Sequence, residues 1–120
     1  MTDEQAFEVL CRVARELTRR FRAALPPELA ATVRDPARVE RGLETEVEER
    51  LGTFWRDNRD QPNADDLNRM REDPHQLAAV LLHEAAADLT TILDHDDEQA
   101  LRHELTEAVI GFLGFDPSVD

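Results

Sequence analysis

The sequence of 120 residues contains no lysine or tyrosine, one cysteine, one serine and four glycines. A single cysteine excludes both an intrachain disulfide and a thiolate-rich metal site. The one serine, Ser118, follows the last helical segment, so no serine-based catalytic triad is expected. The four glycines are scattered and form no glycine-rich loop that would cradle a phosphate. Cys11 lies within a helical pattern and is expected to be a small buried hydrophobe rather than a reactive thiol.

Long hydrophobic runs are also absent. No stretch reaches the roughly 20 apolar residues of a membrane-spanning helix, because the densest one, residues 77–93, is interrupted by His83, Glu84 and Asp88. The first residues, Met-Thr-Asp-Glu, lack the basic and then apolar pattern of a signal peptide. We therefore expect residues 1–120 to form one soluble, cytoplasmic domain that does not bind a membrane.

Negative charge dominates the composition, with a formal net charge of −13. Residues 1–41 hold eight arginines and seven acidic residues, whereas residues 42–120 hold six arginines and twenty acidic residues. Such a surface repels phosphates, so direct binding of nucleic acid is not expected. Two explanations stay open: a functional one, such as attraction of a basic partner or mimicry of a polyanion like DNA, and one in which genome composition or a salt-rich habitat sets the charge.

Hydrophobic residues recur at helical spacing along the chain, and no alternating strand pattern is present. Thr2 and Gln5 predict a capping box at the first helix, and Gly114 is expected to end the last helix with a positive φ. The composition of residues 57–63 predicts a loop. The sequence therefore predicts an all-α compact bundle of four main helices and one short helix. The main helices cover residues 2–25, 35 to about 56, 74 to about 93, and from a cap at Asp96 or Asp97 to 113, and the short one covers about residues 64–71.

The segment from Pro74 to about Leu93 is predicted to be the central helix of the bundle. It has one broad apolar face, and the opposite side carries small residues such as Ala79 and Ala86. Small side chains let a neighbouring helix approach closely, so both sides are expected to be buried.

Glu84 and Asp88 are the candidate metal ligands of this helix. They are four residues apart, and Asp88 is predicted to project on the same side as Leu77 and Leu81. Two carboxylates at this spacing could share a divalent metal ion or act as an acid–base pair. In the alternative interpretation, Asp88 pairs with an arginine of another helix.

The MazG-like family of all-α nucleoside triphosphate hydrolases provides a comparison for this site. Its members place Glu-x-x-Glu on one helix and Glu-x-x-Asp on another around Mg²⁺. Glu46 and Glu49 have the first spacing, but Glu84 and Asp88 are one residue too far apart for the second. Glu46 and Glu49 are also predicted to point toward solvent. The motif is therefore incomplete, and membership of this family is not predicted.

Histidine and aspartate patterns give no further site. His83 has no second histidine four residues on, so the zinc motif His-Glu-x-x-His is absent. The acidic run at residues 94–98 lacks the glycine and the final glutamate of a calcium-binding loop, and helix capping accounts for its acids. We predict no cofactor.

A stripe of arginines is the strongest positive feature. Arg12, Arg15, Arg19 and Arg22 lie on one side of the first helix, opposite its apolar face. This stripe could bind a phosphate, an acidic helix of a partner or a nucleic acid. Alternatively, it provides counter-charges for the acidic second and fifth helices within the same chain.

The sequence favours a non-enzymatic helical module of a regulatory, adaptor or inhibitor type that binds another protein. A second copy of the chain is one candidate partner, because the first helix has an unusually wide apolar arc. No catalytic residue is predicted. Two alternatives stay open: an all-α nucleotide hydrolase that uses a divalent metal held by Glu84 and Asp88, and a polyanion mimic.

Overall fold

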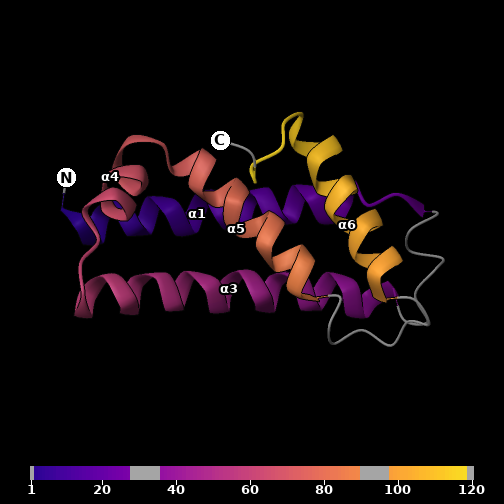
Figure 1. Cartoon of the computed structure of the whole chain (residues 1–120), viewed down its shortest axis with the longest axis horizontal. Helices are drawn as coiled ribbons and strands as arrows, with labels where there is room; N and C mark the ends of the chain where they lie inside the picture. Colours follow the sequence, from indigo (N-terminus) through magenta and orange to yellow (C-terminus); the bar gives the residue numbers. More distant parts are fainter. Residues whose placement is uncertain (1, 28–35, 90–97, 119–120) are drawn as a thin grey trace.

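The structure is a computed structural model that describes residues 2–27, 36–89 and 98–118. These residues form a compact bundle of helices without strands, which confirms the predicted fold class. Four of the described helices are long and one is short (Figure 1). They are α1 (Asp3–Ala23), α3 (Pro36–Asp60), α4 (Ala64–Glu72), α5 (Pro74–Leu89) and α6 (Glu98–Leu113).

Two layers make up the bundle. Helices α1 and α3 run side by side in opposite directions, and α5 crosses both of them obliquely with α6 beside it (Figure 1). The short α4 connects the end of α3 to the start of α5 and packs against α1. One side of the α1–α3 pair is thus covered by the second layer, which leaves α1 with an outward face.

Helix α5 is the central element, as predicted. It packs against each of the other described helices. Leu82 on its broad apolar side is buried, and so are Ala79 and Ala86 on its small-residue side. A Cβ atom built at Gly42 of α3 would lie only 2.4 Å from Leu89 Cδ1, so the missing side chain at this glycine lets α3 approach α5 closely.

The ends of α1 and α6 follow their sequence signals. The Gln5 backbone N–H donates to Thr2 Oγ1 at 3.2 Å, and the Thr2 N–H donates to Gln5 Oε1 at 2.9 Å, which confirms the capping box. Gly114 has a φ of 82° and its N–H donates to the Ile110 carbonyl, which confirms the predicted helix end.

The predicted loop at residues 57–63 is wrong in its first half, because α3 continues to Asp60. Asn58 is buried, and its amide group donates to the Phe54 carbonyl at 2.9 Å. Its side-chain oxygen accepts the Asn63 backbone N–H at 3.1 Å. Asn63 in turn caps α4 by accepting the N–H groups of Asp65 and Asp66. Asn58, which composition assigns to a loop, therefore joins the end of α3 to the start of α4 through hydrogen bonds.

Several predicted features lie outside the described residues. These are the connection between the first two predicted main helices at residues 28–34, the helix start at Asp35, the end of the central helix near Leu93 and the acidic run at residues 94–97. Within the described ranges, no helix combines the length and the apolar composition that crossing a bilayer requires.

Candidate functional site

Two of the four predicted binding arginines join α1 to α3. The Arg15 guanidinium donates to both carboxylate oxygens of Glu48, at 2.6 and 3.1 Å. Arg22 pairs with Glu44 and also lies 3.6 Å from a carboxylate oxygen of Glu40. Because α1 and α3 are antiparallel neighbours, the glutamates at every fourth position of α3 lie beside the arginine stripe. The structure thus shows the internal pairing that the sequence left open for these two residues.

The ion pair between Arg15 and Glu48 also shifts the pKa values of both side chains. Hydrogen bonding to Arg15 lowers the pKa of Glu48, and the same bond raises the pKa of Arg15. Cys11, one turn before Arg15, is buried as predicted, and this burial raises the pKa of its thiol. A raised pKa keeps the thiol protonated at neutral pH, which agrees with a structural role.

Three arginines on the outward side of α1 have only one acidic partner between them among the described residues. Glu16 accepts from Arg19 at 2.5 Å and from Arg20 at 3.1 Å. The hydrogen bond from Arg19 is the main reason why the pKa of Glu16 is lowered. Arg12 is exposed and has no ion pair within the described part of the chain. This face of α1 therefore keeps positive charge although the whole chain carries −13.

Two hollows flank this outward face, and Arg12 contributes to both. The larger, of about 830 Å³, is lined by α1 residues that include Phe7 and Cys11. The smaller, of about 240 Å³, is lined by Val13 and Leu17 of α1 and by His75 of α5. Each hollow combines charged side chains with an apolar wall, which is the mixture found in protein interfaces.

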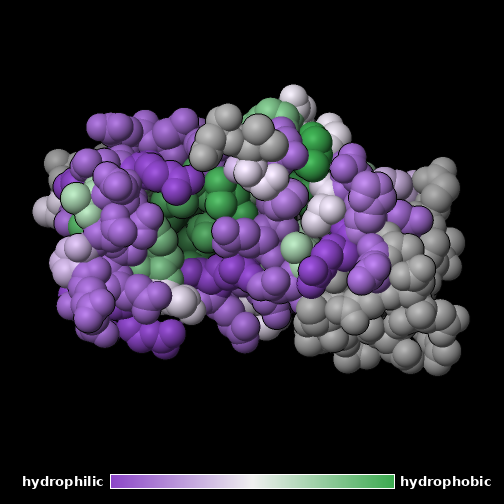
Figure 2. Space-filling view, viewed as in Figure 1, coloured by the Kyte–Doolittle hydropathy of each residue, from purple (hydrophilic) through white to green (hydrophobic). Residues whose placement is uncertain are grey.

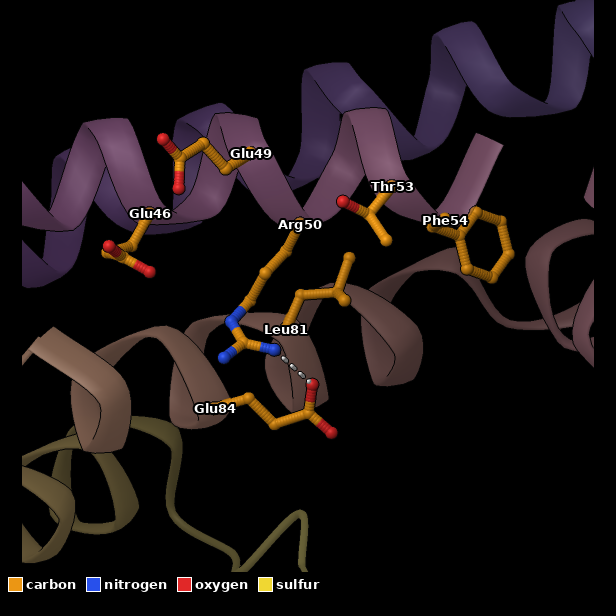
Figure 3. Close-up of a pocket in the computed structure, with 7 residues that line it drawn as sticks. All are labelled: Glu46, Glu49, Arg50, Thr53, Phe54, Leu81 and Glu84. Carbon is orange, nitrogen blue, oxygen red and sulfur yellow. Dashed lines mark hydrogen bonds and ion pairs between the residues drawn. The ribbon is translucent and has the colours of Figure 1, made fainter. Parts of the chain in front are cut away.

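The second candidate site is a hollow of about 360 Å³ between α3 and α5 (Figure 3). The Arg50 side chain extends from α3 toward α5, where it donates to Glu84 at 3.1 Å and pairs with Asp88 (Figure 3 draws the pair with Glu84). The interpretation in which Asp88 meets an arginine of another helix is confirmed. Both carboxylates remain about half exposed, at 50% for Glu84 and 54% for Asp88, so neither is an acid buried in the core.

Glu46 and Glu49 line the same hollow from α3, and Phe54 and Leu81 supply apolar walls (Figure 3). Glu49 is exposed, as predicted, whereas Glu46 is half-buried, and the Glu49 carboxylate points away from Glu84 (Figure 3). Their spacing was visible in the sequence, but the hollow that they line together with Glu84 depends on how two distant helices pack. Across the described ranges, however, no group of three or more histidine, cysteine or acidic side chains is arranged to hold a metal ion.

Hydrophilic side chains cover most of the face seen in Figure 2, and apolar surface is visible in a hollow beside α5 and at the end of α6. Three carboxylates of α3, those of Glu40, Glu44 and Glu48, are engaged by arginines of α1. They do not act as free phosphate-like charges, and polyanion mimicry stays a prediction.

No protein-family model matches the chain, and no curated protein or solved structure matches it either.

Proposed function

We propose that this chain is a non-enzymatic interaction module of a regulatory, adaptor or inhibitor type, and that it binds another protein through the outward face of α1. One observation carries the proposal. Arg12 lies between two hollows with apolar walls and has no ion pair in the described part of the chain, while Arg19 and Arg20 share the single carboxylate of Glu16. The face thus offers exposed guanidinium donors that outnumber their acidic partners, together with apolar walls.

The chemistry of this face agrees with what interfaces use. Arginine is enriched among the residues that dominate binding energy, because it combines a long apolar stem with several donors in a fixed plane. The stems of Arg12 and Arg19 lie beside the hollow that also exposes part of Phe7. A partner with acidic side chains at the rim and an apolar side chain between them would satisfy both features.

The test is affinity capture from the native lysate, with mass spectrometry to identify and quantify the captured proteins. The wild-type chain is compared with Arg12→Glu and with Arg56→Glu, a control at an exposed arginine of α3 outside both hollows. We expect a specific protein to be captured by the wild type and the control and to be lost with Arg12→Glu. Equal capture by all three chains, or no specific capture, would contradict the proposal.

A second candidate function is a divalent-metal-dependent nucleotide hydrolase. The observation that favours it is a hollow lined by Glu46 and Glu49 of α3 and by Glu84 of α5. A metal ion there would have to compete with Arg50, which pairs with Glu84 and Asp88. The test is release of phosphate or pyrophosphate from a panel of nucleoside triphosphates with Mg²⁺ or Mn²⁺. Release that is lost with Glu84→Gln would support this candidate, and no release with any nucleotide would remove it.

A further inference from the structure

The outward face of α1 carries charges that alternate in sign along one stripe. Glu8, Arg12, Glu16 and Arg20 follow one another at intervals of four residues, so they form a single slightly inclined row on the helix. Glu8, Arg12 and Arg20 are exposed and Glu16 is half-buried. We call this row the charged ridge.

We propose that the charged ridge is a self-complementary surface whose partner is a second copy of this chain. The ridge of one copy would lie antiparallel to the ridge of the other, with a two-fold axis between them. This inference rests on the proposed function and names the partner. Glu8 then faces Arg20 of the second copy, and Arg12 faces Glu16 of the second copy.

The order of the charges selects the antiparallel arrangement. When the two ridges run antiparallel, an acidic residue of one copy lies opposite a basic residue of the other at all four positions. A parallel arrangement in register would instead place Glu8 against Glu8 and Arg12 against Arg12, which costs energy. A two-fold axis also makes each cross-contact occur twice, so that the surface is closed and the assembly stops at two copies.

The chain itself leaves half of the ridge unused. Glu8 and Arg12 are neighbours on the ridge, but neither has an ion pair within the described residues. Glu16 is engaged by Arg19 and Arg20 of its own helix, and in the proposed dimer Arg12 of the second copy would be a further donor to it. The hollows on either side of the ridge, with Phe7 and Cys11 in one and Val13 in the other, leave room for side chains of the second copy.

The charge distribution also restricts where two copies can meet. Residues 42–120 carry a formal charge of −14, because they hold twenty acidic residues and six arginines. Two surfaces from this part would repel each other. Residues 1–41 carry +1, so a face built from α1 meets the least repulsion when a second copy approaches.

A charge-exchange series tests the pairing of Arg12 with Glu16. The association of the purified chain is measured by sedimentation velocity over a range of concentrations, for the wild type, Arg12→Glu, Glu16→Arg, the double variant and an equal mixture of the two single variants. Arg56→Glu is the control for an exposed arginine outside the ridge. Circular dichroism establishes that each variant is folded.

The wild type, the control and the double variant are expected to form dimers. Each single variant creates two like-charge contacts and is expected to weaken association at least about tenfold. The mixture is expected to restore it, because the glutamate introduced at position 12 of one variant then faces the arginine introduced at position 16 of the other. Since exposed ion pairs are screened, raising the salt from roughly 0.05 to 0.5 M should also weaken the wild-type dimer.

Three results would overturn the inference: a wild-type chain that stays monomeric at every concentration, single variants that associate like the wild type, or a mixture that stays monomeric. The outcome separates the inference from the proposed function. If the pure chain is monomeric but captures a protein from the lysate in a manner that depends on Arg12, the partner is not a second copy. The proposed function as an interaction module then remains. If it neither dimerises nor captures a protein, both fail.

Discussion

Substitution of Gly42 by alanine tests how closely α3 packs against α5. A Cβ atom at this position would lie 2.4 Å from Leu89 Cδ1, 3.5 Å from Leu89 Cγ and 3.6 Å from Leu89 Cδ2. Leu89 is completely buried, so its side chain has no open space into which it could turn. One of the two helices would have to move away, and that movement would disturb the packing of the first turns of α3 against the end of α5.

The magnitude follows from two opposing effects. Glycine to alanine within a helix is worth about 1 kcal/mol in favour of alanine, whereas an extra methyl group in a well-packed core costs about 1–3 kcal/mol. Gly52, also in α3, is the matched control, because a Cβ atom added there would have no other atom within 4 Å. We expect Gly52→Ala to raise the free energy of unfolding by about 0.5–1 kcal/mol. The free energy of unfolding of Gly42→Ala should be lower than that of Gly52→Ala by about 1–3 kcal/mol, which is the cost of overpacking alone.

Urea unfolding followed by far-ultraviolet circular dichroism measures both variants against the wild type. Because the two glycines lie in the same helix, differences in helix propensity cancel between them. If Gly42→Ala were as stable as Gly52→Ala, the close approach of α3 and α5 at Leu89 would be refuted.

Two further predictions concern single contacts. Asn58→Ala should lower the free energy of unfolding by about 1–3 kcal/mol, because it leaves the Asn63 N–H without its acceptor and removes the side-chain hydrogen bond to the Phe54 carbonyl. Urea unfolding would measure the change, and a loss below a few tenths of a kcal/mol would show that this residue does not join α3 to α4. Glu48→Gln should cost less than about 1 kcal/mol at pH 7, because the pair with Arg15 is exposed. The folded-state pKa of Glu48 is lowered, so its contribution is present above the unfolded pKa of about 4.3 and is lost as the pH falls through the lower folded value. The free energies of unfolding of the wild type and of Glu48→Gln should therefore converge in acid. A difference between them that persisted at pH ~2 would contradict the role of this ion pair.

The helices could be predicted because their signals are local. The capping box of Thr2 and Gln5, the positive φ of Gly114 and the two-sided burial of α5 all follow from spacing within one segment. The end of α3 could not be predicted in the same way. Asn58 is typical of loops, and it is helical here because its side chain finds the Phe54 carbonyl and the Asn63 N–H.

The candidate sites were only partly predictable, because they depend on which helices are neighbours. The sequence identified the arginine stripe, but it left open that Arg15 and Arg22 would pair with α3 while Arg12 would not. The sequence likewise identified Glu84 and Asp88 as candidate residues, but it did not identify Arg50, which pairs with both. Arg50 is one of fourteen arginines, and only the packing of α3 on α5 selects it.

Sedimentation velocity of the mixed single variants tests most directly the central claim that the charged ridge of α1 recognises a second copy of the chain. We predict that Arg12→Glu and Glu16→Arg are each largely monomeric alone and form dimers when mixed in equal amounts. A mixture that sediments as the sum of two monomers would contradict the claim that the charged ridge of α1 recognises a second copy of the chain.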